Sequence, residues 1–145
     1  MIIERIFTER EGYASSFREI YQDKGASYFK EIETDAVERA LGTENAVISL
    51  GGGTLAGNEE LPLRMKDHQI IYLAVHPDLL YERILKDGLP AFFDTENSRK
   101  SFDNLYAERE PFYRELSGMV FENSSGTPFE TAQKILTELE KWDGG

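Results

Sequence analysis

The sequence AVISLGGGT at residues 46–54 joins a short apolar run to three consecutive glycines and a threonine. An apolar run rich in β-branched residues is typical of a strand buried on both faces, as in a parallel sheet. Glycines directly after such a strand permit positive φ angles and leave backbone N–H groups open to a phosphate or a hydroxyl. The stretch therefore predicts either a ligand-binding turn after a buried strand or an ordinary turn between a strand and a helix.

Two further apolar runs, HQIIYLAV at residues 68–75 and GMVFEN at 118–123, also predict strands. Segments with the apolar spacing of helices lie between and around them. The predicted helices cover residues 14–24, 27–41, part of 58–66, 78–87, 98–116 and 127–142, with a left-handed cap at Gly42. Alternating strands and helices indicate an α/β fold, a three-layer sandwich with a central parallel sheet that binds ligands at the carboxyl ends of its strands.

The composition limits the function classes. The 145 residues fit a single domain over 1–145, and the formal net charge of −11 argues against nucleic acid or an anionic membrane as a partner. The absence of cysteine excludes disulfides and thiolate metal sites, and His68 and His76 lack nearby partners, so no metal site is predicted. The chain has no apolar run near the roughly 20 residues that span a bilayer, and its N-terminus is too charged for a signal peptide. The expected location is the cytoplasm.

Four stretches occur in an order and at spacings that are typical of one protein family: GASYFKEIE at 25–33, AVISLGGGT at 46–54, IIYLAVHPDLLYERI at 70–84 and EREPFYREL at 108–116. Together they resemble the shikimate kinase family, and the resemblance extends over nearly the whole chain. It implies a P-loop kinase-like fold and the ATP-dependent phosphorylation of the shikimate 3-hydroxyl, a step of aromatic amino-acid biosynthesis. ATP and Mg²⁺ are the implied cofactors, and a small carboxylic acid is the implied ligand.

The resemblance also implies which residues bind the substrate. Lys30 and Arg109 match the two arginines that grip the substrate carboxylate, and Glu33 matches the acid that helps to position one of them. The glycines of the turn would approach the shikimate ring and its hydroxyls; they are Gly51, Gly52 and Gly53. Lysine lacks the bidentate fork of arginine, so a weaker or differently oriented grip is expected at position 30.

For the nucleotide, the resemblance implies that Arg83 flanks the adenine and that Asn123 and Ser124 begin the adenine loop. Plain alternatives remain open for the two arginines. Arg83 and Arg109 could instead be surface residues of charged helices, paired with neighbouring glutamates.

Two departures from the family pattern concern phosphate chemistry. Leu89 stands where the family's lid carries an arginine, and no G-x-x-x-x-G-K-[ST] phosphate loop or Asp-x-Asp strand end occurs in the 145 residues. The sequence therefore predicts a chain without the family's first strand, phosphate loop and first helix. Such a chain alone is expected to be inactive. The alternative is a non-catalytic relative that acts as a small-acid-binding or protein-interaction module.

A sheet without its central strand must be completed in some other way, because unpaired buried backbone groups cost about 1–3 kcal/mol each. The sheet could close up, recruit the N-terminal residues, or accept a strand from a partner polypeptide or a second copy. The apolar cluster in MIIERIF favours recruitment. It predicts a strand over residues 2–7, parallel to a strand over residues 46–50.

Overall fold

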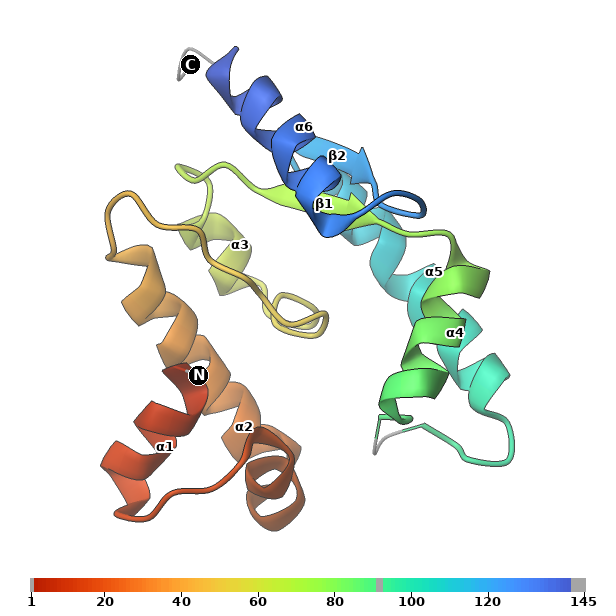
Figure 1. The fold of residues 1–145 in the computed structure, drawn as a ribbon. Coiled ribbons are helices and arrows are strands. Elements are labelled where there is room, and N and C mark those ends of the chain that lie inside the picture. The colour runs from red at the N-terminus through yellow and green to blue at the C-terminus, as the bar shows by residue number, and fades with distance from the viewer. Residues whose placement is uncertain (1, 91–92, 142–145) are drawn as a thin grey trace. The chain divides into compact units, whose positions relative to one another are not determined.

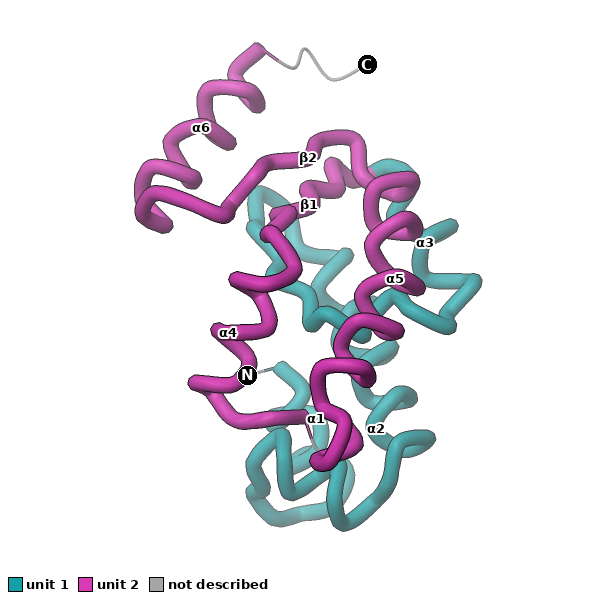
Figure 2. Tube along the Cα trace, turned by 90° about the vertical axis from the view of Figure 1, so that its right-hand side faces the viewer, with its two compact units in different colours: residues 1–67 teal, residues 68–145 magenta. Residues whose placement is uncertain are grey.

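The structure, a computed structural model, describes residues 2–90 and 93–141 of the chain. Its elements in chain order are α1 (Ile2–Glu11), α2 (Phe17–Leu41), α3 (Glu60–Arg64), β1 (Ile71–Ala74), α4 (Pro77–Asp87), α5 (Ser98–Leu116), β2 (Met119–Glu122) and α6 (Pro128–Glu140) (Figure 1). The chain divides into two compact units, residues 1–67 and 68–145 (Figure 2). The single domain expected over residues 1–145 stays a prediction.

In the first unit, α1 packs against α2 (Figure 1). Ile6 and Phe7 of α1 are 0% and 1% exposed, and they contact buried residues of α2. The Phe7 ring meets Tyr13 and Tyr28 edge-on, at centroid distances of 5.2 and 6.3 Å. The core of the unit comprises Ile6, Phe7, Ile20, Phe29, Ile32 and Ala36.

The strand predicted over residues 2–7 is wrong, because these residues form the first part of α1. Ile3, Ile6 and Phe7 have the i, i+3, i+4 spacing that brings side chains to one face of a helix. Burial of this face against α2 stabilises the helix, and this outweighs the preference of isoleucine and phenylalanine for strands.

Helix α2 contains two predicted helices separated by a kink. Ser16 and Glu19 form a reciprocal capping box at its start, and Gly25 interrupts it with φ 82° and ψ 173°. The second part ends near Gly42, whose φ is −77°, so the left-handed cap expected there is wrong. Thr43 instead donates its backbone N–H to the Ala40 carbonyl, at 2.9 Å.

The strand predicted over residues 46–50 is also wrong. No strand is assigned to this segment, and Val47 is fully exposed. A strand needs a hydrogen-bonded neighbour, and within the described part of the first unit this segment has none. The apolar pattern was therefore insufficient to define a strand.

The second unit contains the two other predicted strands. β1 and β2 pair in parallel, with Ile71 opposite Met119 and Ala74 opposite Glu122. The sheet of the described residues consists of these two strands, so the parallel pairing is confirmed and the larger central sheet is not seen. The pairing continues beyond the strands, since Gly118 N–H donates to Ile70 O at 3.1 Å and Asn123 N–H to Ala74 O at 2.7 Å.

Helices α4 and α5 contact each other through Tyr81, whose ring lies 5.3 Å from that of Phe102 and whose hydroxyl is 2.7 Å from the Ser98 hydroxyl. α5 also contacts β1, because the Tyr113 ring lies 5.6 Å from that of Tyr72. Burial raises the pKa of Tyr72 to about 12. Helix positions in this unit agree with the sequence prediction.

Helix α6 begins as its sequence predicts. Pro128 occupies the first turn, and Thr127 and Glu130 form a reciprocal capping box. Two predicted segments reach outside the described residues. These are the lid match at 88–93, which includes Ala91 and Phe92, and the end of the last helix at Trp142.

Candidate functional site

The glycine turn at residues 51–54 is closed by a hydrogen bond from the Thr54 N–H to the Gly51 carbonyl, at 3.0 Å. Gly51 and Gly52 are exposed, whereas Thr54 is 2% exposed. A Cβ atom on Gly51 would lie 3.1 Å from the Thr54 hydroxyl, closer than side chains normally approach. The turn therefore presents glycine backbone outward and buries a threonine hydroxyl behind it.

Lys30 of α2 ties this turn to the helix. Its Nζ donates to the carbonyl of Gly53 at 2.8 Å and to that of Thr54 at 2.6 Å, and it lies 3.3 Å from Oε2 of Glu33. The two carbonyls lie 23 and 24 residues after Lys30 in sequence, whereas Glu33 lies on α2 itself. Lys30 is thus the point at which α2 and the turn meet.

Glu33 completes the attachment one helical turn later. Its side chain is 10% exposed, and its Oε1 accepts the Thr54 hydroxyl at 2.7 Å while Oε2 faces Lys30. Each carboxylate oxygen therefore has a donor. Loss of either donor would leave one oxygen of this largely buried carboxylate without a partner, so the three side chains form a mutually dependent group. Lys30, Glu33 and Thr54 are called the turn anchor below.

Asn58 fixes the far side of the turn. Its Oδ1 accepts the backbone N–H groups of Glu60 and Leu61 at the start of α3, and its Nδ2 donates to the Thr34 hydroxyl at 3.3 Å. The sequence analysis missed Thr54 and Asn58. Asn58 could have been found, because an asparagine two residues before a short helical run is a common helix-start signal.

Arg109, the second cation expected at the substrate carboxylate, lies half-buried on α5. It belongs to the second unit, whereas the turn anchor and the glycines belong to the first. The structure thus brings together Lys30, Glu33 and the glycine turn. The shared grip of Lys30 and Arg109 on one carboxylate stays a prediction.

The three residues expected at the nucleotide gather at the carboxyl ends of β1 and β2. Arg83 of α4 approaches the Asn123 carbonyl at 3.5 Å, and the Ser124 hydroxyl accepts the backbone N–H of His76 at 2.8 Å. Asn123 Oδ1 accepts the hydroxyl of Thr131, a buried α6 residue that sequence reasoning missed. Their proximity agrees with the sequence analysis, and their role in nucleotide binding stays a prediction.

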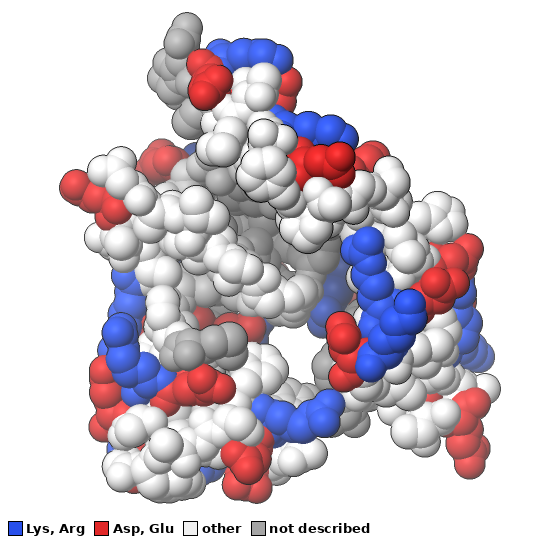
Figure 3. Space-filling view, viewed as in Figure 1, with Lys and Arg blue, Asp and Glu red and all other residues white. Residues whose placement is uncertain are grey.

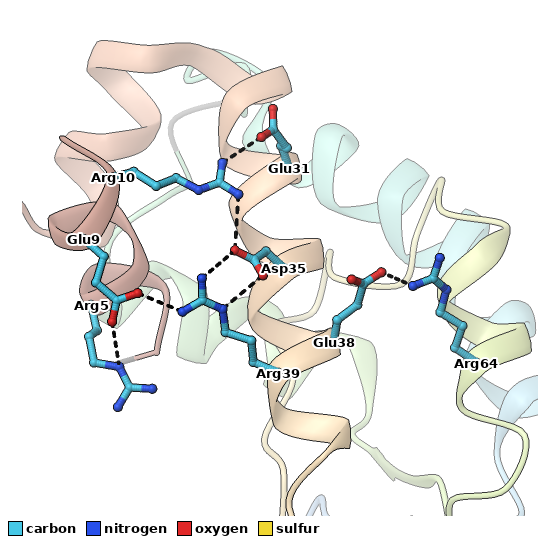
Figure 4. Close-up of polar contacts among 8 residues, drawn as sticks. All are labelled: Arg5, Glu9, Arg10, Glu31, Asp35, Glu38, Arg39 and Arg64. Carbon is cyan, nitrogen blue, oxygen red and sulfur yellow. Dashed lines mark hydrogen bonds and ion pairs between the residues drawn. The ribbon is translucent and has the colours of Figure 1, made fainter.

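The surface of the first unit carries a charged network between α1 and α2 (Figure 4). Arg10 pairs with Glu31 at 2.7 Å and with Asp35 at 3.2 Å, while Arg39 pairs with Asp35 at 3.1 Å and with Glu9 at 2.8 Å. The Arg39 guanidinium lowers the pKa of Asp35 by hydrogen bonding. Figure 3 shows acidic and basic side chains next to one another on the visible face.

Within residues 2–90 and 93–141, no group of three His, Cys, Asp or Glu side chains is placed to hold a metal ion. Over the same ranges, no helix has the length and apolar character needed to cross a membrane.

Comparison with known proteins assigns the chain to a family. The family model described as "Shikimate kinase" matches residues 3–140. The chain belongs to the shikimate kinase family. The shikimate kinase of Enterococcus faecalis is 31% identical over 134 residues, which cover 87% of this chain and 75% of that protein. The shikimate kinase of Ralstonia nicotianae is 29% identical over 121 residues, which cover 83% of this chain and 64% of that protein.

Solved structures of shikimate kinases share the fold. The enzyme of Acinetobacter baumannii in complex with shikimate aligns with a TM-score of 0.78 and 24% identity, over 96% of this chain and 76% of that one. The shikimate kinase of Aquifex aeolicus aligns with a TM-score of 0.68 and 27% identity, over 96% of this chain and 78% of that one. The chain spans only part of the length of the shikimate kinases that it matches.

Proposed function

We propose that this chain binds a shikimate-like cyclic carboxylic acid at the glycine turn of residues 51–54. The observation that carries the proposal is the turn itself, held on α2 by Lys30 and Glu33 with its glycine backbone outward. Backbone that carries no side chain allows a ring and its hydroxyls to approach closely. Membership of the family and the shikimate complex of the Acinetobacter baumannii relative support this choice of ligand.

Arg109 supplies the main charge for the ligand carboxylate in this proposal. Its planar guanidinium can bind both carboxylate oxygens at once, which gives orientation as well as affinity. The residues proposed on the side of the turn are Lys30, Glu33, Gly51, Gly52 and Gly53, all of the first unit. In the family reaction the bound acid would receive the γ-phosphoryl group of ATP on its 3-hydroxyl, with Arg83, Asn123 and Ser124 near the adenine.

We expect these 145 residues alone not to transfer the phosphoryl group. Phosphoryl transfer depends on positioning and on neutralising the charge of the phosphates, which a phosphate loop, its lysine and Mg²⁺ supply. The sequence contains no such loop, and Leu89 occupies the position of the lid cation.

A non-catalytic relative that acts as a small-acid-binding or protein-interaction module is the alternative, and its acid-binding form shares the binding step proposed here. The cytoplasmic location and the completion of the sheet by a partner polypeptide or a second copy remain predictions. The prediction that another polypeptide completes the sheet rests on its size, because the sheet of the described residues has two strands.

Calorimetry with shikimate tests the binding proposal. Arg109→Ala should weaken affinity about ten- to hundred-fold, the effect of losing a charged hydrogen-bond partner. Lys100→Ala, an exposed cation of the same helix, is the matched control and should leave the affinity within twofold. An affinity equal in wild type and Arg109→Ala would place the ligand elsewhere, and the absence of binding to wild type would contradict the proposal.

A further inference from the structure

The ammonium group of Lys30 has three acceptors within the first unit. It carries three N–H donors and no acceptor. The carbonyl oxygens of Gly53 and Thr54 lie at 2.8 and 2.6 Å, and Glu33 Oε2 lies at 3.3 Å. A ligand carboxylate that contacted Lys30 directly would have to displace one of these acceptors, and two of them are short hydrogen bonds.

The charge of Lys30 is also compensated locally. Glu33 lies one helical turn away, and its buried carboxylate brings the pair to a net charge of zero. A compensated pair attracts an anion far less than an isolated cation does, because attraction to Lys30 is opposed by repulsion from Glu33.

The same contacts suit a different task. Two successive carbonyl groups, those of Gly53 and Thr54, converge on a single cation, which fixes the orientation of both peptide planes against α2. The Thr54 hydroxyl bonded to Glu33 fixes the next atoms of the turn. A compact ammonium can serve three converging acceptors, whereas the planar fork of arginine matches parallel ones.

We propose that Lys30 is a positioning residue, which shapes the glycine turn through its carbonyls and does not contact the ligand carboxylate. This inference rests on the proposed function and deepens it. The turn then recognises the ring and hydroxyls of the acid through its backbone. Affinity at this site should thus depend on Lys30 whether or not the ligand is charged.

The first test uses the protein without ligand. Amide hydrogen exchange of Thr54, measured by NMR, reports the turn because its N–H donates to Gly51. Lys30→Gln removes the charge but keeps two donors, and Lys30→Met removes both charge and donors. Thr54 exchange should rise at least tenfold in Lys30→Met and less in Lys30→Gln. Lys66→Met, an exposed lysine of the same unit, is the control and should leave it unchanged. Unchanged Thr54 exchange in folded Lys30→Gln and Lys30→Met would overturn the inference.

The second test compares shikimate with its uncharged carboxamide by calorimetry, at a temperature where every variant is folded. Lys30→Gln should weaken both ligands at least fivefold and by the same factor within twofold, whereas Arg109→Ala should weaken shikimate selectively. A loss tenfold larger for shikimate than for the carboxamide in Lys30→Gln would mean direct contact and would overturn the inference. If Lys30→Gln binds both ligands as tightly as wild type but has a lower Tm, Lys30 serves the stability of the fold alone. That result would also overturn the inference.

The two tests separate the two proposals. If wild type binds neither ligand, the proposed function is wrong, while hydrogen exchange still decides whether Lys30 anchors the turn. If wild type binds shikimate and Thr54 exchange does not respond to Lys30, the binding proposal stands and the positioning role is wrong.

Discussion

Gly25 holds a backbone conformation inside α2 that other residues adopt only at a cost. Its φ of 82° and ψ of 173° lie in a region that is nearly specific to glycine. A Cβ at this position would meet no atom within 4 Å, so the cost of a substitution comes from the backbone alone. The kink therefore depends on one residue.

We expect Gly25→Ala to lower the free energy of unfolding by about 1–3 kcal/mol, through backbone strain. Urea unfolding followed by circular dichroism measures it. Gly42→Ala is the matched control, because Gly42 has an ordinary φ of −77° and its added Cβ would meet its nearest atom at 3.6 Å. Equal midpoints for the two variants would mean that Gly25 can be replaced without strain.

At the scale of single residues, the sequence predicted a glycine turn, and the family resemblance implied that it lies near Lys30 and Glu33. It did not predict the turn anchor. The burial of the Thr54 hydroxyl on Glu33 depends on how α2 and the turn pack, and local sequence patterns do not encode such packing. For the same reason, the resemblance identified Lys30 without revealing that its donors are directed to backbone carbonyls.

At the scale of elements, α1 contributes Ile6 and Phe7, which are 0% and 1% exposed, to the core of the first unit. Phe7→Ala should cost about 3–5 kcal/mol of unfolding free energy, because it leaves a cavity next to Tyr13 and Tyr28. Thermal unfolding and urea titration measure the loss. Phe129→Ala on α6, where the ring is 69% exposed, is the control and should stay within about 0.5 kcal/mol.

A Phe7→Ala variant as stable as the control would show that α1 is dispensable for the fold of this unit.

The sequence predicted some elements well and others wrongly, for a physical reason. Helices satisfy their backbone hydrogen bonds locally, and the predicted positions of α2, α5 and α6 lie close to the observed ones; α2 and α6 also begin with capping boxes. The segments 2–7 and 46–50 were misassigned because a strand depends on a neighbour that the local sequence does not specify.

At the scale of the whole molecule, acid should destabilise the chain through its paired carboxylates. Hydrogen bonds from Arg39 lower the pKa of Asp35, and that from Lys24 lowers the pKa of Glu11. A carboxyl whose pKa is lower in the folded state stabilises the protein above its unfolded pKa, about 3.9 for aspartate. This stability is lost as the pH falls through the folded pKa.

Melting temperatures between pH 7 and pH 2 test this linkage. At pH 7 the Tm of Asp35→Asn should be lower than that of wild type. The difference in Tm should become smaller below about pH 4, because wild-type Asp35 then becomes protonated. Asp67→Asn, an exposed carboxylate of the same unit, serves as the control and should follow wild type throughout. A difference that stays constant down to pH 2 would mean that Asp35 acts through packing and not through charge.

Catalysis is tested on the 145-residue chain. With Mg-ATP and shikimate, the chain should form no shikimate 3-phosphate above background, because its residues include no phosphate loop. The shikimate kinase of Enterococcus faecalis provides the positive control for the assay. Turnover at ordinary kinase rates, about 1–100 per second, would contradict the expectation.

The parallel pairing of β1 with β2 also sets a folding order. Ile71 meets Met119 only after α4 and α5 have been synthesised and the intervening chain has closed into a loop, which costs entropy before any strand contact repays it. The α1–α2 pair joins residues much closer in sequence, as in the contact of Arg10 with Glu31. During refolding, the first unit should therefore become protected early, while β1 and β2 remain unpaired and exposed to aggregation for longer.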